Sequence, residues 1–166
     1  PSDTPASPMA AVDRRDACRR EYDDPAYRRF HAPPIACPDC GPVLELVSKE
    51  TGITSRGEDA LTGARDALAS GAILAVKGLG GYHLACDARN TAAVAELRRR
   101  KGRGNKPFAL MVASIGVARE LVNITEGEED LLSGVRRPIV LLPHRDVDTA
   151  RHVAASVAPG NPSLGV

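Results

Sequence analysis

The chain has 166 residues, 43% of them hydrophobic and 26% charged, with a formal net charge of +1 at pH 7. This length allows one ordinary domain and a small additional module, and the balanced charge gives no overall attraction to nucleic acid or membrane. With no Trp, two Phe and three Tyr, the core must be aliphatic, and a single-stranded nucleic-acid platform of stacked aromatic rings is disfavoured.

The cysteine content limits the cellular setting. Four cysteines occur without a signal-peptide pattern, and no apolar run approaches the ~20 residues of a membrane span. In such a chain the thiols indicate metal binding or burial rather than disulfides. The sequence therefore predicts a cytoplasmic protein with no membrane partner.

Composition divides the chain into three parts. Residues 1–8 are rich in Pro, Ser and Asp, and we expect a disordered leader. Residues 9–47 hold three of the cysteines and few core-forming side chains, which is typical of a small module held by metal. Residues 57–166 alternate apolar runs with helical patterns, and the final residues, APGNPSLGV, enter a new apolar run. We therefore expect a domain that continues beyond Val166.

The order of the predicted elements indicates an α/β or α+β domain with a mixed sheet and flanking helices. The apolar runs at 72–77 and 107–112 are continuous, which is typical of interior strands buried on both faces. In chain order we predict a strand at 43–47, a polar turn at 48–56, a helix at 57–70, strands at 72–77 and 82–86, a helix from 90 or 91 to 101, a strand at 107–112, helices at 114–122 and 125–133, and a strand at 138–142.

The cysteines before residue 47 suggest a zinc site. Cys37 and Cys40 form a C-x-x-C knuckle, and Cys18 precedes it by eighteen intervening residues. Two such pairs would hold zinc tetrahedrally, but Arg15 stands where the first pair needs its other cysteine. His31 could supply a fourth ligand. A knuckle held by packing without metal is the alternative.

A basic run begins in the last turn of the second predicted helix of the α/β region and continues beyond it. Six of the nine residues from Arg98 to Lys106 are cationic. Arg98–Lys101 could simply be solvated residues at a helix C-terminus, where positive charge suits the helix dipole. Lys101, Arg103 and Lys106 continue across two glycines, however, and with Lys77 they could converge on a triphosphate. The residues alone leave both interpretations open.

Other candidate sites are weaker. The turn Gly78-Leu79-Gly80-Gly81 matches neither the dinucleotide-binding nor the Walker pattern, and it indicates a tight turn. His83 lies in an apolar segment, which is more typical of a core histidine than of a general base. Cys86 is expected to be a buried apolar residue. Asn123-Ile124-Thr125 fits the glycosylation pattern, but without a secretion signal we expect it to cap a helix.

Four strings make the sequence recognisable. EYDDPAYRRFHAPPIACPDCGP, GAILAVKGLGGYHLACDARN, RRRKGRGNKPFALMV and RPIVLL resemble the HypF-type carbamoyltransferases of nickel–iron hydrogenase maturation, in register from about residue 9 to residue 166. The second half is similar to the YrdC family, which makes threonylcarbamoyl-adenylate, and Lys101-Gly102-Arg103 corresponds to its K-G-R phosphate-binding motif.

The resemblance implies a second zinc-finger motif and the first part of a YrdC-like domain. In that family carbamoyl phosphate gives carbamate, which reacts with ATP to form carbamoyl-adenylate. The carbamoyl group then passes to a cysteine of a partner hydrogenase-maturation protein. The resemblance also implies roles for single residues. ATP, with Mg²⁺, and carbamate would be held by Lys77, Lys101, Arg103 and Lys106, and His83 would lie near the reacting carboxylate. Zn²⁺ would be bound by Cys18, Cys37 and Cys40.

Two features limit what the resemblance implies. Arg15 replaces an expected zinc ligand, and the sequence ends before the family's Thr-Ser-Gly-Asn segment of the nucleotide pocket. We therefore expect this segment alone to be inactive. The alternatives are a non-catalytic RNA-binding module of the YrdC type, which would show a steep salt dependence, and a threonylcarbamoyl-adenylate synthase-like enzyme.

Overall fold

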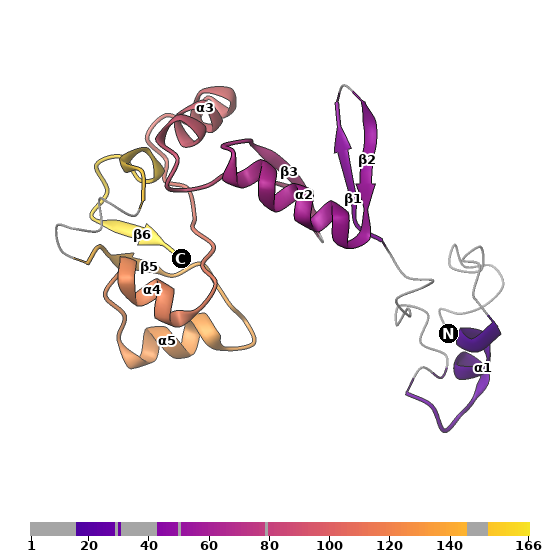
Figure 1. Cartoon of the computed structure of the whole chain (residues 1–166). Coiled ribbons are helices and arrows are strands. Elements are labelled where there is room, and N and C mark those ends of the chain that lie inside the picture. The colour runs from indigo at the N-terminus through magenta and orange to yellow at the C-terminus, as the bar shows by residue number, and fades with distance from the viewer. Residues whose placement is uncertain (1–15, 29, 31–42, 50, 79, 146–152) are drawn as a thin grey trace. The chain divides into compact units, whose positions relative to one another are not determined.

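The structure, a computed structural model, describes residues 16–28, 30, 43–49, 51–78, 80–145 and 153–166. The chain divides into two compact units, Pro1–Leu61 and Thr62–Val166 (Figure 1). Its described residues form a mixed α/β fold, as the sequence predicted. None of the helices among them has the length and apolar character needed to cross a membrane.

The first unit contains a helix and a β-hairpin. Helix α1 spans Asp16–Asp23, and strands β1 (Glu45–Ser48) and β2 (Gly52–Arg56) pair antiparallel. The polar turn predicted over 48–56 is therefore wrong for most of its length. The polar composition of this stretch hid a strand whose β-branched residues, Ile53 and Thr54, favour extended backbone.

Helix α2 (Gly57–Ala69) confirms the helix predicted at 57–70. The chain leaves the helix through Gly71, two residues after its end, whose φ of 91° lies in the left-handed region that glycine adopts without a steric penalty. The Gly71 N–H donates to the Leu68 carbonyl at 3.0 Å, and the Ala72 N–H donates to the Ala67 carbonyl at 2.9 Å. These bonds satisfy carbonyls that the last helical turn would otherwise leave without partners.

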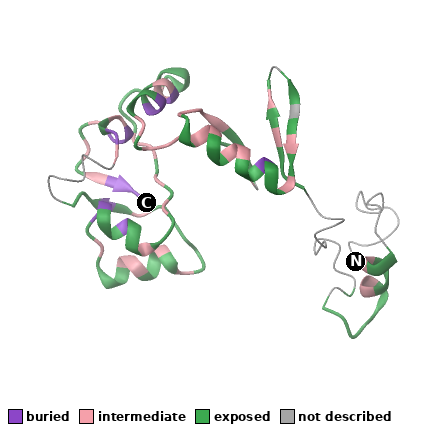
Figure 2. Ribbon diagram, viewed as in Figure 1, coloured by how far each residue is buried: buried purple, intermediate pink, exposed green. Residues whose placement is uncertain are grey.

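Strands β3 (Leu74–Gly78) and β4 (Gly81–Ala85) form an antiparallel hairpin, with Gly78 opposite Gly81 at the turn. Both predicted strands are confirmed, but the prediction that the first is an interior strand is wrong. Its three central residues, Ala75, Val76 and Lys77, are exposed (Figure 2). In the described residues β3 pairs with β4 alone, and no further strand covers its other edge.

Three further helices begin after polar residues, and all three helices were predicted from the sequence. Helix α3 spans Thr91–Lys101, and the Asn90 side chain accepts the Ala93 N–H at 3.0 Å. Helices α4 (Ile115–Leu121) and α5 (Glu126–Ser133) begin after Ser114 and Thr125. The Glu128 carboxylate accepts the backbone N–H and the hydroxyl of Thr125, which completes a capping box.

The C-terminal strands close the core. Strands β5 (Leu141–Pro143) and β6 (Ser163–Gly165) pair antiparallel, and a 3₁₀ turn, η3, spans Ala155–Val157. The strand predicted at 138–142 is confirmed in part, because β5 begins three residues later. The core residues come from α3, α4, η3, β5, β6 and neighbouring residues; they are Val94, Leu121, Val122, Leu142, Ala154, Val157, Ala158 and Leu164 (Figure 2).

The strand predicted at 107–112 is not formed. The segment is extended, but its hydrogen bonds go to two different places: the Phe108 N–H donates to the Val157 carbonyl at 2.8 Å and the Leu110 N–H to the Gly165 carbonyl at 2.7 Å. Only Ala109 makes a ladder bridge, parallel to Gly165, and Pro107 has no N–H to donate. Because the partners change from η3 to β6, no continuous ladder develops.

Candidate basic-loop site

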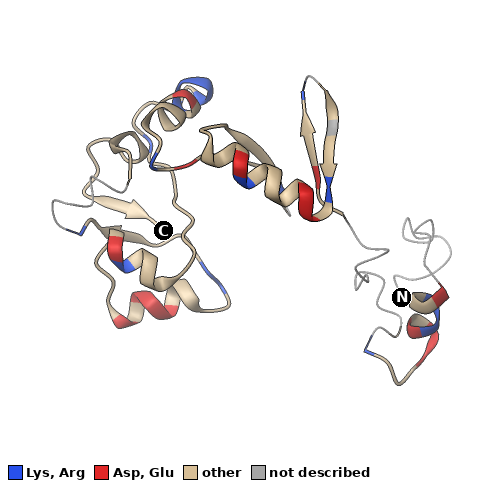
Figure 3. Cartoon of the chain, viewed as in Figure 1, with Lys and Arg blue, Asp and Glu red and all other residues tan. Residues whose placement is uncertain are grey.

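Helix α3 determines where the basic run lies. Ala93, Val94 and Leu97 are its buried residues, and the cationic residues Arg98–Lys101 make up its last turn (Figure 3). Gly102 ends the helix with φ 56° and ψ 34°, a left-handed conformation that costs other residues about 1–2 kcal/mol. The chain therefore turns directly from the helix into the loop that carries Arg103 and Lys106.

Arg98 is not the solvated residue that its place in a charged run suggested. Its Nε and Nη2 donate to the Ser156 carbonyl at 3.0 and 2.6 Å, and Nη2 also approaches the Val157 carbonyl at 3.3 Å. Its Nη1 donates to the Lys106 carbonyl at 3.0 Å and to the Gly104 carbonyl. One half-buried guanidinium thus joins the basic loop to a segment 58 residues away.

Phe108 brings two arginines of the run together. The guanidinium carbons of Arg98 and Arg103 lie 4.7 and 4.9 Å from the centroid of its ring, within the range of cation–π attraction. Arg103 also donates from Nη2 to the Pro107 carbonyl at 2.7 Å and from Nε to the Lys106 carbonyl at 3.2 Å. We call Arg98, Arg103 and Phe108 the arginine clamp.

Arg99 and Arg100 share one carboxylate partner on the helix surface. Both pair with Glu96, at 2.7 Å from Arg99 Nε and 2.6 Å from Arg100 Nε. Hydrogen bonds from Arg99 and then from Arg100 lower the pKa of the Glu96 carboxyl to about 2. These two cations consequently have a carboxylate partner within their own helix, at the i, i+3 and i, i+4 spacings that helix geometry favours.

Lys101 and Lys106 are exposed, as Arg99 and Arg100 are, but they have no partner such as Glu96. Within the ranges that the structure describes, neither makes an ion pair closer than 4.0 Å. Their positive charge is therefore not compensated locally by a described carboxylate. Of the six cations in the run, these two are the most available to an anionic ligand.

Lys77 and His83 lie on the β3–β4 hairpin. Lys77 Nζ is 5.1 Å from the centroid of the Tyr82 ring, directly across the ladder. His83 is exposed, so the interpretation of a core histidine is wrong, and its ring lies against Gly78, where an added Cβ would come 2.7 Å from His83 Cδ2. None of the described contacts joins these two residues to Lys101, Arg103 or Lys106.

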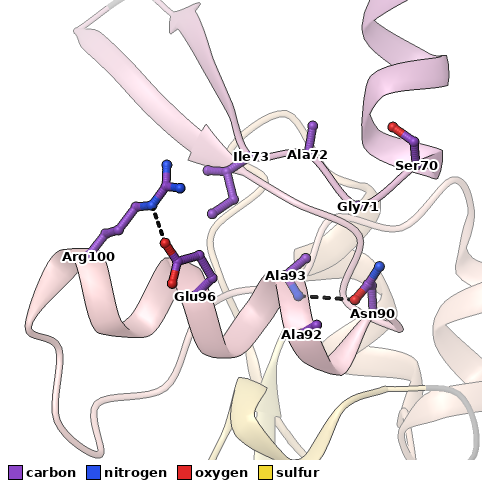
Figure 4. Close-up of a pocket in the computed structure, with 9 residues that line it drawn as sticks. All are labelled: Ser70, Gly71, Ala72, Ile73, Asn90, Ala92, Ala93, Glu96 and Arg100. Carbon is purple, nitrogen blue, oxygen red and sulfur yellow. Dashed lines mark hydrogen bonds and ion pairs between the residues drawn. The ribbon is translucent and has the colours of Figure 1, made fainter.

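A shallow, open depression of about 470 Å³ lies beside α3 (Figure 4). It is bounded by the connection from α2 to β3, at Ser70–Ile73, and by the Asn90, Glu96 and Arg100 side of α3. Its one arginine is paired with Glu96 (Figure 4), and it includes none of the four predicted phosphate-binding residues. This depression is therefore separate from the candidate site.

The predicted zinc ligands are only partly described. Cys18 lies on α1, whereas Cys37, Cys40, His31 and Arg15 lie outside the described residues. Among those that are described, no group of three or more His, Cys, Asp and Glu side chains could hold a metal. Cys86 packs half-buried against the core, and burial, together with the charge of Asp87, raises the pKa of its thiol.

The sequence contained one indication that Arg98 is partly buried, although its charge suggested an exposed residue. Arg98 follows Val94 by four residues and Leu97 by one, so it continues the buried stripe of α3. A cation on that stripe must either leave the core or find acceptors in it. The carbonyls that accept its hydrogen bonds come from distant residues, which spacing alone does not identify.

Comparison with known families accounts for both parts of the chain. The Sua5/YciO/YrdC family, described as "Telomere recombination", matches residues 66–166, and the family described as "HypF finger" matches residues 16–47. The carbamoyltransferase HypF of Rhodobacter capsulatus is 48% identical over all of this chain, which spans 21% of that protein. The HypF of Rhizobium leguminosarum bv. viciae is 43% identical over 91% of the chain, which spans 24% of it.

Two solved structures extend the similarity to three dimensions. The crystal structure of full-length HypF in the phosphate- and nucleotide-bound form matches all of the chain with a TM-score of 0.80 and 39% identity, over 21% of its own length. The crystal structure of T. kodakarensis HypF matches 95% with a TM-score of 0.78 and 40% identity, over 20% of its length. The chain thus spans about a fifth of these proteins. It belongs to the Sua5/YciO/YrdC family, in the HypF-type arrangement in which a HypF finger precedes that domain.

Proposed function

We propose that this chain forms the finger and the first part of the adenylate-forming domain of a HypF-type carbamoyltransferase. The observation that carries the proposal is the 48% identity to the Rhodobacter capsulatus carbamoyltransferase HypF across the complete sequence, finger and basic loop included. The reaction assigned to this domain is the formation of carbamoyl-adenylate from carbamate and ATP, as a step in hydrogenase maturation.

In this reaction a carbamate oxygen bonds to the α-phosphorus of ATP, and the bond to pyrophosphate breaks. Lys101 and Lys106, exposed and without a described carboxylate partner, would bind phosphate oxygens as point charges. Arg103 would stabilise charge on the departing pyrophosphate with the part of its guanidinium that the loop carbonyls do not engage. Lys77 and His83, on the hairpin, would contact the carbamate end.

Two metals belong to this proposal. Mg²⁺ would accompany the nucleotide and offset the negative charge of its phosphates. Zn²⁺ would be bound in the finger by Cys18, Cys37 and Cys40. The donor chemistry fits zinc, because thiolates from a knuckle and a distant segment are its usual structural ligands, and Arg15 leaves one position to another donor.

The carbamoyl group would pass from the adenylate to a partner maturation protein through another part of the enzyme, in the cytoplasm. The test is ATP–pyrophosphate exchange by the complete gene product, with and without carbamoyl phosphate. We expect exchange that requires carbamoyl phosphate and Mg²⁺. Exchange that requires threonine and bicarbonate instead would assign the chain to threonylcarbamoyl-adenylate synthesis, and no exchange, with RNA binding that weakens steeply with salt, would assign it to RNA recognition.

A further inference from the structure

Arg98 engages all three of its guanidinium nitrogens with backbone carbonyls. The acceptors belong to two segments: Gly104 and Lys106 in the basic loop, and Ser156 and Val157 in η3. A guanidinium presents its donors in a fixed planar fork, so it fixes the distance and direction between the two segments. The hydrogen bonds are charge-assisted and hence stronger than those between neutral groups.

Besides Arg98, the loop is held chiefly by Arg103, whose guanidinium donates to the Lys106 and Pro107 carbonyls. Gly102 and Gly104 both adopt positive φ, 56° and 58°, and glycine has the widest conformational freedom of any residue. Two main-chain bonds of the loop are long: the Arg103 N–H donates to the Arg98 carbonyl at 3.3 Å and the Lys106 N–H to the Arg103 carbonyl at 3.4 Å. The conformation of the loop therefore depends on the guanidinium groups that bind its carbonyls.

This conformation sets where the two exposed lysines lie. Lys101 precedes Gly102, and Lys106 contributes its own carbonyl to Arg98. A different loop conformation would move the two ammonium groups relative to each other. Small displacements of groups that position a substrate can lower the reaction rate strongly.

We infer that Arg98 is a positioning residue for nucleotide binding. Through Phe108 and the carbonyls of Gly104 and Lys106 it holds the loop so that Lys101 and Lys106 can bind phosphate, and it does not bind phosphate itself. This inference rests on the proposed function. The alternative is that Arg98 binds phosphate directly, like another cation of the charged run.

The first test measures the loop directly by hydrogen–deuterium exchange on the complete gene product, without ligand. Arg98→Lys keeps the charge but loses the planar fork, and Phe108→Leu keeps an apolar side chain but loses the ring. Both should speed exchange of the Lys106 and Phe108 amides and leave the Glu129 amide of α5 unchanged. Arg99→Ala, which removes a cation of the same helical turn, should alter none of them.

The second test measures ATP–pyrophosphate exchange kinetics with the same variants. Arg98→Lys should raise KM for ATP about tenfold, the effect of losing one hydrogen bond to a charged group, with little change in kcat. Phe108→Leu should act in the same direction and Arg99→Ala should have no effect.

Wild-type kinetics for Arg98→Lys, or unchanged amide exchange in the loop, would overturn the inference. A positive charge at position 98 would then be enough, and the planar guanidinium would not be needed to hold the loop. A variant that unfolds, seen as faster exchange in α5 as well, is replaced by Arg98→Gln, for which the same outcomes are expected. Absence of nucleotide activity in the wild-type protein would overturn the proposed function instead, and the amide exchange of the loop would still decide whether Arg98 holds it.

Discussion

The guanidinium carbon of Arg98 lies 4.7 Å from the centroid of the Phe108 ring, across a loop of nine intervening residues. This contact joins the last turn of α3 to the extended segment that follows the basic loop. Arg103 contacts the same ring, so two of the six cations of the run stabilise the conformation of the loop. The charge cluster is thus divided between residues that hold backbone, residues paired with Glu96, and two exposed lysines.

The core of the second unit depends on Leu142. Its side chain has no solvent exposure and belongs to the main buried cluster. We expect Leu142→Ala to lower the free energy of unfolding by about 2–5 kcal/mol, from lost burial and the cavity left behind. Leu141→Ala, at an adjacent position that is 68% exposed, is the matched control and should have a much smaller effect in urea denaturation. Equal effects would contradict the assigned orientation of β5.

Gly102 and Gly127 form a matched pair for backbone conformation. Gly102 has φ 56°, so Gly102→Ala should destabilise the protein by about 1 kcal/mol, the cost of the left-handed conformation. Gly127 lies in the first turn of α5, and no neighbour would obstruct an added Cβ. Gly127→Ala should therefore stabilise it by about 0.5–1 kcal/mol. Thermal unfolding compares the two, and a stabilising Gly102→Ala would show that α3 does not end there as described.

The carboxyl of Glu96 should titrate far below the ordinary range. Its pKa in the folded protein is about 2, because Arg99 and Arg100 donate hydrogen bonds to the ionised form. A lowered pKa stabilises the folded state above the unfolded value of about 4.3, and this contribution is lost as the pH falls from there through 2. NMR titration should show Glu96 still ionised at pH 3, and Glu96→Gln should remove this part of the acid sensitivity. A midpoint near 4.3 would mean that the ion pairs do not persist in solution.

The finger should respond to restoration of its missing cysteine. If Cys18, Cys37 and Cys40 bind zinc, Arg15→Cys should raise the zinc content of the purified protein and its thermal stability, since thiolates bind zinc at ~2.3 Å in structural sites. Arg14→Cys, one residue away, is the control and should not change either quantity. No response to Arg15→Cys would indicate a finger that no longer uses metal.

The helices were largely predictable from sequence, because their ends are set by local chemistry. Asn90, Ser114 and Thr125 occupy N-cap positions, and polar caps of this kind are visible in a sequence without any tertiary information. Strand burial was not predictable in the same way. The apolar run at 72–77 forms a strand, but whether its faces are covered depends on which other strands and helices lie beside it.

The sequence located the basic loop, but it did not show how the cations of that loop differ in their contacts. Six clustered cations pointed to the loop, yet sequence spacing cannot show that Arg98 reaches the Ser156 carbonyl 58 residues away. The ion pairs of Glu96 lie at helical spacing and could have been read from the sequence. The contact of Arg103 with Phe108 could not, because it depends on how the chain turns at Gly102 and Gly104.

The central claim is that the basic loop binds nucleotide phosphate through its exposed lysines, and equilibrium binding of Mg²⁺–ATP to the complete gene product tests it most directly. Lys101→Ala and Arg99→Ala each remove one exposed cation near the end of α3. We predict that Lys101→Ala weakens ATP binding roughly tenfold to a hundredfold, the effect of losing a charged hydrogen bond worth about 1.5–3 kcal/mol, while Arg99→Ala leaves it unchanged. Equal weakening by both, or by neither, would contradict the assignment of the loop as a phosphate site.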